Sequence, residues 1–282
     1  MLGSLPKHYK DILKIRKEDQ EPWMIAMKEE IKSLHERKVW NLIDLPKGRQ
    51  IIKGRWVYAM KSKSRKKAQS VAKGFTQVFR IDYENTFSPV AQFETLQLLL
   101  SLAALHDWEL EALDVKTAFL FGELKEEGKE FKVCRLQKAI YGLKQAALQW
   151  NKQLHKSLLE MDFTHSLSDP GIHFKIIGQE IIILLVYVDN ALFMGSNKTQ
   201  VLTHKKQFIK RWESRDLGEA KEYLGMKIMR NHKKQTITLD QTCYVEKVIK
   251  QFGQENCKPV SVPLPTRYNP RSNSDKEANA TL

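Results

Sequence analysis

The sequence IIILLVYVDNALFM, residues 181–194, contains the pattern from which the fold is predicted. Residues 181–188 form a continuous apolar run rich in β-branched side chains, which is typical of a strand buried on both faces. Asp189 and Asn190 interrupt this run, and the apolar character resumes over residues 191–194. Because Asp and Asn favour tight turns, we predict a β-hairpin that turns at these two residues.

A second strand that ends in a carboxylate precedes the hairpin. Residues 108–113 alternate in character and lead into Asp114. A carboxylate beside an apolar strand is costly unless a cation or hydrogen bonds neutralise it. If the two strands lie side by side, Asp114 and Asp189 converge at one end of a sheet, where they could bind Mg²⁺. The alternative is that Asp189 and Asn190 serve only as the turn, and spacing alone favours neither interpretation.

Helices are predicted before, between and after these strands along the chain. Apolar residues at helical spacing predict helices over residues 94–106, 143–161 and 201–212, and a fourth helix that Pro22 opens. A last strand pair is predicted over residues 223–229 and 236–239, followed by a polar, Pro-rich tail. Helices interspersed with hairpins indicate the α+β class.

The composition bounds the class of protein and its partners. The chain has 282 residues, of which 42% are hydrophobic and 28% charged, so it can bury a core and is neither wholly disordered nor a polytopic membrane protein. Lys and Arg number 47 against 33 Asp and Glu, a formal net charge of +14. Such an excess favours polyanionic partners, although a merely soluble basic protein is the alternative.

The basic residues gather in one segment. Residues 45–81 contain eleven Lys or Arg and no acidic residue, interleaved with the strand-like stretches RWVYAMK and SVAKGFTQ. We therefore predict a basic β-hairpin that follows a phosphate backbone, rather than a merely solvated face. The residues assigned to nucleic-acid binding here are Lys53, Arg55, Lys61, Lys63, Arg65, Lys66 and Lys67.

The cysteines and the N-terminal segment bear on location. Cys134, Cys243 and Cys257 are too few and too scattered for a disulfide framework. The first residues lack the apolar core of a signal peptide, and the longest apolar run is far shorter than the ~20 residues of a bilayer span. We expect an intracellular protein, cytoplasmic or nuclear, with no membrane partner.

Eight stretches occur together in an order that resembles one family. They are WNLIDLPKG, VAKGFTQ, IDYENTFSPVA, LDVKTAFLFGEL, VCRLQKAIYGLKQA, LLVYVDN, DLGEAKEYLGMKI and CKPVSVP. The chain is similar to the reverse transcriptase domain of Ty1/copia-type retrotransposon Pol polyproteins over roughly residues 20 to 265. This resemblance implies a right-hand polymerase with fingers, a palm built on an antiparallel sheet with the catalytic hairpin, and a partial thumb. The corresponding divisions are an N-terminal extension 1–20, an N-terminal helix and basic fingers region 21–107, a palm 108–240, the start of a thumb 241–257 and a tail 258–282.

The resemblance also implies roles for individual residues. Asp114 and Asp189 would be the catalytic, metal-binding carboxylates for two Mg²⁺ or Mn²⁺ ions, with Asn190 as the last residue of the YVDN sequence. The substrates would be deoxynucleoside triphosphates and a primed RNA or DNA template. The residues implied to contact the nucleotide are Lys73, Phe119, Lys144 and Gln145, and those implied to grip the primer end are Tyr223 and Gly225. Solvated surface lysines and an ordinary core aromatic are the alternatives for Lys73, Lys144 and Phe119.

Several positions depart from the family pattern. Asn190 replaces the second Asp of YVDD, Gln69 stands where the family has Arg, and Leu148 replaces the Arg of KQAPR. The stretch between Glu127 and Val133 is also shorter than in the family. We expect the fold to persist while polymerase activity is weak or absent. The alternatives are a catalytically inactive nucleic-acid-binding relic and a non-functional transposon fragment.

Overall fold

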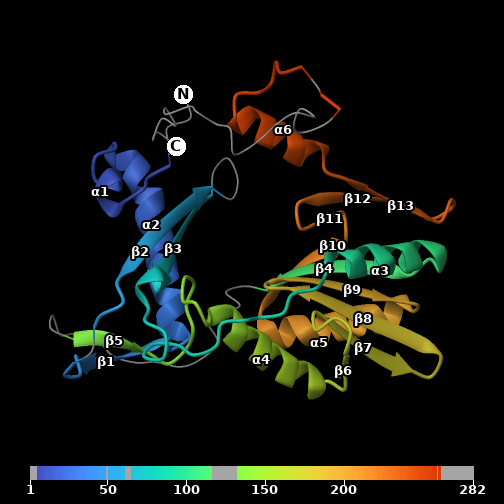
Figure 1. Ribbon diagram of the computed structural model, residues 1–282, viewed down its shortest axis with the longest axis horizontal. Coiled ribbons are helices and arrows are strands. Elements are labelled where there is room, and N and C mark those ends of the chain that lie inside the picture. Colours follow the sequence, from blue (N-terminus) through green and yellow to red (C-terminus); the bar gives the residue numbers. More distant parts are fainter. Residues whose placement is uncertain (1–4, 49, 61–64, 116–131, 259, 262–282) are drawn as a thin grey trace, which may run out of the picture. The chain divides into compact units, whose positions relative to one another are not determined.

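The computed structural model describes residues 5–48, 50–60, 65–115, 132–258 and 260–261. The chain divides into two units, Met1–Leu239 and Asp240–Leu282, and each is described by itself. Figure 1 labels the helices and strands. None of the helices in these described ranges has the length and apolar character that a membrane span requires.

The first unit contains a six-stranded sheet of order β10-β4-β9-β8-β7-β6, in which all neighbours are antiparallel. The bounds are β4 Glu109–Val115, β6 Thr164–His165, β7 Ile172–Ile177, β8 Glu180–Tyr187, β9 Asn190–Gly195 and β10 Ser214–Glu219. The predicted hairpin is confirmed as β8 and β9, but its turn lies one residue earlier than predicted, at Val188 and Asp189, because Asn190 already pairs with Tyr187 in the ladder. The strand that carries Asp114 pairs with β9 and not with β8, so the hairpin's second arm, β9, lies between β4 and β8.

Helices cover both faces of this sheet, which explains the continuous apolar run. Ile183 and Leu185 of β8 belong to the core beneath α3 (Phe93–Leu105). Ile182, Leu184 and Val186 belong to the core beneath α4 (Ala146–Leu159) and α5 (Lys198–Trp212). Successive side chains of a strand point to opposite faces, so both sets must be apolar. Figure 1 shows α3 on one side of the sheet and α4 and α5 on the other.

The basic hairpin consists of β2 (Gly54–Met60) and β3 (Lys66–Ala72), as predicted. It packs on α2 (Lys17–Glu36), where Trp23 meets Tyr58 edge to face with ring centroids 5.4 Å apart. Ile12 of α1 (Tyr9–Ile12) is fully buried in the same core, so residues expected to form an extension contribute to the fold.

The sequence-based start of α2 is wrong, because the helix begins at Lys17 and Pro22 lies inside it. Pro22 falls in the second turn, where its missing N–H removes one intrahelical hydrogen bond. Buried Trp23, Ala26 and Leu34 supply the packing that offsets this loss. The stretch SVAKGFTQ is also only partly strand: β3 ends at Ala72, and Gly74–Thr76 form a 3₁₀ turn, η1.

Smaller sheets complete the first unit. Strands β1 (Trp40–Asp44) and β5 (Lys132–Leu136) pair beside the end of α2. Strands β11 (Glu222–Tyr223), β12 (Met226–Asn231) and β13 (Thr236–Asp240) form a three-stranded sheet. The predicted last strand pair is confirmed as β12 and β13, but the strand predicted over residues 223–229 is interrupted by a turn at Leu224 and Gly225. Antiparallel sheets together with helices confirm the α+β class, while the division into fingers, palm and thumb stays a prediction.

The second unit contains α6 (Thr242–Gln251), whose described residues include no buried side chain. Tyr244, Val245 and Phe252 are exposed. The predicted tail lies outside the described residues from residue 262 onward.

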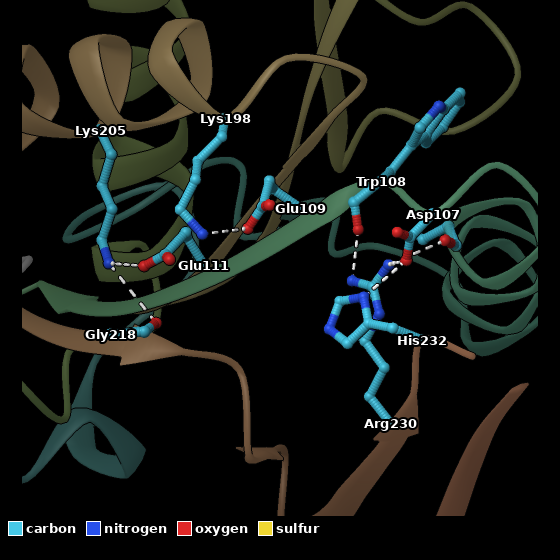
Figure 2. A network of polar contacts seen from close by, with 10 residues as sticks. Asp107, Trp108, Glu109, Glu111, Lys198, Lys205, Gly218, Arg230 and His232 are labelled. Atoms are coloured by element: carbon cyan, nitrogen blue, oxygen red, sulfur yellow. Dashed lines mark hydrogen bonds and ion pairs between the residues drawn. The ribbon is translucent and has the colours of Figure 1, made fainter. Parts of the chain in front are cut away.

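A buried cation joins α5 to two strands of the large sheet. Lys205 has a side chain only 1% exposed, and its Nζ lies 2.6 Å from Glu111 Oε2 of β4 and also pairs with Asp216 of β10. Figure 2 shows Lys205 reaching Glu111 and the Gly218 carbonyl, and beside them the pair between Lys198 and Glu109. Lys198 differs because its side chain is 64% exposed. We call the contacts of Lys205 with Glu111 and Asp216 the Lys205 clamp.

We predict that Lys205→Met lowers the free energy of unfolding by about 3 to 5 kcal/mol, because it leaves Glu111 as a buried carboxylate without its cation. Lys198→Met is the matched control and should cost far less than Lys205→Met, since exposed pairs contribute little. Urea denaturation of both variants measures the two losses. Equal losses would show that the Lys205 clamp does not stabilise the fold.

Three histidines gather where α4, β6 and β7 meet. The His155 and His173 rings approach with Nδ1 and Nε2 3.2 Å apart, and the His165 ring centroid lies 4.9 Å from that of His155. His173 is 2% exposed, and its Nδ1 has no hydrogen-bond partner in the described part of the chain. Burial, together with repulsion from His165 and His155, lowers the pKa of His173 to about 4.

This pKa predicts a loss of stability in mild acid. The unfolded chain takes up a proton at His173 near pH 6.5, whereas the folded chain does so only near pH 4, so stability falls as the pH drops through this window. Between pH 7.5 and pH 5.0 the native protein should lose about 2 kcal/mol more than His173→Phe. His106→Phe, which changes an exposed histidine, should behave like the native protein. Equal losses in the native protein and His173→Phe, measured by urea denaturation, would contradict this.

Candidate catalytic site

The tight turn between β8 and β9 is held from two sides. Val188 has a φ of 56°, a left-handed conformation that β-branched residues rarely adopt. The indole Nε1 of Trp150 on α4 donates to the Val188 carbonyl at 2.6 Å. The Val115 amide at the end of β4 donates to the Asp189 carbonyl at 2.8 Å. These hydrogen bonds fix the turn against a helix and a neighbouring strand.

The structure brings Asp114 and Asp189 to the same end of the sheet. Asp114 lies directly opposite Asn190 in the pairing of β4 with β9, and Asp189 is the residue before it. The amide Nδ2 of Asn190 donates to Asp189 Oδ1 at 3.2 Å, so the side chain that replaces a carboxylate is turned toward the remaining one.

A guanidinium also reaches this end of the sheet. Arg215 of β10 pairs in register with Asp114 of β4, and its Nη2 lies 3.1 Å from Asp114 Oδ2. The Asp114 side chain is 25% exposed and the Arg215 side chain 53% exposed, so the pair faces solvent. Sequence reasoning missed Arg215, and the only available signal was a basic residue directly before the DLGEAKEYLG stretch.

Two tyrosines flank the aspartates. Burial raises the pKa of Tyr141 above its usual range, and the charges of Asp189 and Asp114 raise it further. Burial likewise raises the pKa of Tyr223, with further contributions from Tyr187 and Asp189, and the Tyr223 hydroxyl donates to the Asn190 carbonyl at 3.4 Å. Both phenols therefore stay protonated at neutral pH and can act as hydrogen-bond donors.

The predicted primer-end residues lie at a turn beside the hairpin. Tyr223 ends β11, and Leu224 and Gly225 both have positive φ, 51° and 77°. Two consecutive left-handed residues are typical of a tight type I′ turn, which leads here into β12. The contact of Tyr223 with Asn190 places this turn next to the aspartates.

The residues predicted to bind nucleotide come from two adjoining loops. The Ala72 amide at the end of β3 donates to the Tyr141 carbonyl at 2.8 Å, which ties the basic hairpin to the loop before α4. A Cβ on Gly142 would lie 2.2 Å from the Ala72 carbonyl oxygen, so this approach requires glycine. Lys73 follows Ala72 and caps η1, with its side chain half-buried.

Lys144 and Gln145 contact the loop that follows η1. The Lys144 Nζ donates to the Tyr83 hydroxyl at 3.0 Å and lies 4.7 Å from the centre of its ring. Gln145 accepts a hydrogen bond from Gln77 Nε2 at 3.0 Å and donates to the Asp82 carbonyl at 3.3 Å. Both side chains are therefore placed by contacts within the protein.

The substituted positions and the remaining predicted residues also have places in the structure. Gln69 lies on β3, where its side chain hydrogen-bonds Tyr141, and Leu148 lies in the first turn of α4.

The residues predicted to bind nucleic acid differ in exposure: Arg55 and Arg65 are exposed, and Lys67 is half-buried. Lys53 is exposed, while Lys66 lies over the Trp23 ring at 4.9 Å. Phe119, Lys61, Lys63 and most of the shortened stretch after Glu127 lie outside the described residues.

The donor set fits one hard divalent cation better than two. Mg²⁺ is commonly bound by one or two carboxylates, with water and substrate phosphate completing its shell, and Asp114 and Asp189 supply two. Within the described ranges, no group of three or more His, Cys, Asp or Glu is arranged to hold a metal ion. Asn190 could add only a neutral oxygen, and that would require its amide to turn away from Asp189.

Comparison with known proteins identifies the family. Residues 37–266 match the family described as reverse transcriptase (RNA-dependent DNA polymerase). The retrovirus-related Pol polyprotein from transposon TNT 1-94 of Nicotiana tabacum is 39% identical over 277 residues, covering 92% of this chain and 21% of that protein. The corresponding polyprotein from transposon RE2 of Arabidopsis thaliana is 34% identical over 263 residues, covering 86% of this chain and 18% of that protein.

A more distant relative is the Gag-Pol polyprotein of transposon Ty1-ER2 from Saccharomyces cerevisiae, which is 27% identical over 215 residues and covers 67% of this chain and 12% of that protein. The chain thus spans at most 21% of the length of these three relatives. The family match covers most of the chain and includes every residue of the Asp114–Asp189 site. This chain belongs to the reverse transcriptase (RNA-dependent DNA polymerase) family and corresponds to that domain of Ty1/copia-type retrotransposon Pol polyproteins.

Proposed function

We propose that the chain adds deoxynucleotides to a primer on an RNA or DNA template, with Asp114 and Asp189 as its catalytic carboxylates, and that Asn190 makes this reaction slow. The observation that carries the proposal is the placement of both carboxylates at one end of one sheet: Asp114 lies on β4, and Asp189 lies in the turn before β9, where the Val115 amide bonds its carbonyl. Nucleotidyl transfer depends mainly on positioning, and these backbone contacts hold both residues in place.

The reaction forms a bond between the primer 3′-oxygen and the α-phosphorus and breaks the bond to pyrophosphate, while the hydroxyl proton passes to solvent. A bound Mg²⁺ or Mn²⁺ lowers the pKa of the attacking hydroxyl and neutralises charge on the phosphates. Asp114 and Asp189 would hold that cation. The turn at Tyr223 and Gly225 would hold the primer end, because it contacts Asn190.

Lys73, Lys144 and Gln145 are proposed to position the nucleotide. Lys144 now bonds Tyr83 and the Gln77 carbonyl, so its ammonium would have to exchange these partners for phosphate oxygens. Gln69 and Leu148 cannot supply the bidentate cationic contacts that arginine makes with phosphate. Since deoxynucleoside triphosphates are the proposed substrates, the proposed activity is intracellular.

Nucleic-acid binding without catalysis is the second candidate. Two observations favour it: the basic residues of β2 and β3, and the pairing of Asp114 with Arg215. The hairpin would track phosphates whether or not the aspartates bind a cation.

Restoring the lost carboxylate tests catalysis. Asn190→Asp restores a carboxylate and should raise the rate of primer extension on oligo(dT)-primed RNA by about tenfold or more in Mg²⁺ or Mn²⁺. Asp189→Ala is the blank. Asn231→Asp adds the same charge at a position where the side chain already accepts a hydrogen bond from the Lys234 amide, and should leave the rate unchanged.

Equal rates for the native chain and Asn190→Asp, both above the blank, would contradict the proposed impairment. Rates at the blank level for every protein would leave binding without catalysis as the better account.

Removing charge from the basic hairpin tests nucleic-acid binding. Changing Arg55, Arg65 and Lys67 together to Gln should reduce the slope of log K against log salt for a primer–template by about 2 to 3, since each lost phosphate contact lowers it by about 0.7 to 0.9. The control changes Lys152, Lys206 and Lys210, exposed lysines of α4 and α5, to Gln and removes the same charge. Fluorescence anisotropy at several salt concentrations measures the slopes. Equal reductions in both triple variants would show that net charge, and not the hairpin, governs binding.

A further inference from the structure

Strand β10 pairs with β4 and is linked to it by a buried cation. The Lys205 clamp holds Asp216 of β10 and Glu111 of β4 on one buried ammonium. Arg215 immediately precedes Asp216, and Asp114 lies three residues after Glu111. The Lys205 clamp therefore holds the residue next to Arg215, which lies opposite Asp114 in the pairing of β10 with β4.

Each aspartate of the candidate site already has a donor from this chain. Arg215 Nη2 lies 3.1 Å from Asp114 Oδ2, and Asn190 Nδ2 lies 3.2 Å from Asp189 Oδ1. Counting formal charges, Asp114 and Asp189 contribute −2 and Arg215 contributes +1, which leaves −1 for an incoming cation. A divalent ion that contacts Asp114 would also lie close to the Arg215 guanidinium. The positive charges of the ion and the guanidinium would then repel each other.

We propose that Arg215 competes with the divalent cation for Asp114, so that cation binding requires the guanidinium to leave this carboxylate. This inference rests on the proposed function, because it concerns the same pair of aspartates. The Arg215 side chain is 53% exposed, so the guanidinium can turn toward solvent when it is displaced. The Arg215–Asp114 pair thus lowers the affinity of the site for metal and adds to the effect of Asn190.

The experiment counts bound Mn²⁺ by electron paramagnetic resonance during titration of the full chain, with no nucleic acid present. Arg215→Gln should bind Mn²⁺ on the order of tenfold more tightly than the native protein, because one nearby positive charge is gone. Arg215→Lys keeps the charge and should stay within about twofold of the native affinity. Arg211→Gln is the matched control: it removes an arginine that pairs with Glu160 at a similarly exposed position on α5, and should leave the affinity unchanged.

Asp189→Ala separates failure of this inference from failure of the proposed function. If Asp189→Ala abolishes binding while the native protein and Arg215→Gln bind Mn²⁺ equally, the competition is overturned and the metal site stands. If no protein binds Mn²⁺, or if Asp189→Ala binds as well as the native chain, both the competition and the metal site are overturned. If Arg215→Gln lost its thermal unfolding transition, Arg215→Met would take its place, with the same tightening expected.

Discussion

The two-residue connection between β8 and β9 is the constraint on which the candidate site depends. Val188 adopts a backbone conformation that valine rarely adopts, and it is held there by hydrogen bonds that Trp150 and Val115 donate to the two carbonyls of the turn. The Trp150 ring packs edge to face on Trp212, with centroids 4.9 Å apart, so the turn is coupled to both α4 and α5. Strained residues at tight turns often mark functional sites, and here the strain accompanies the placement of Asp189 beside Asp114.

Burial of the sheet on both faces determines the electrostatics of its end. Apolar side chains fill both cores, so charged groups near the sheet need partners from the chain. Lys205 meets this need for Glu111 in the interior, and Arg215 meets it for Asp114 at the rim. The same pairing that stabilises Asp114 without metal opposes a divalent cation there. The proposed weak metal binding is therefore compatible with the reverse transcriptase fold, and the proposed phosphate contacts of the basic hairpin would not require that metal.

Local sequence patterns predicted most of the helices and strands. The contacts between the candidate site residues depend on how distant strands pair, which those patterns do not specify. The β8–β9 hairpin and α3 follow from apolar periodicity and turn residues, which are properties of short segments. The start of α2 differs from the prediction because tertiary packing by Trp23 outweighs the helix-breaking tendency of Pro22, which lies inside the helix. Arg215 could not be assigned from sequence, since its position opposite Asp114 depends on the register of two strands about a hundred residues apart. The fingers and thumb divisions, and the roles of Lys73, Lys144 and Gln145, stay predictions from family resemblance.

A crystal structure of the Arg215→Gln chain soaked in Mn²⁺, with anomalous scattering used to locate the ion, tests the proposed metal site most directly. We expect a single manganese peak bound by Asp114 and Asp189 at the β8–β9 turn, with the Trp150 indole still bonded to the Val188 carbonyl. A manganese ion bound elsewhere, or the two carboxylates turned to opposite faces of the sheet, would contradict the proposed site.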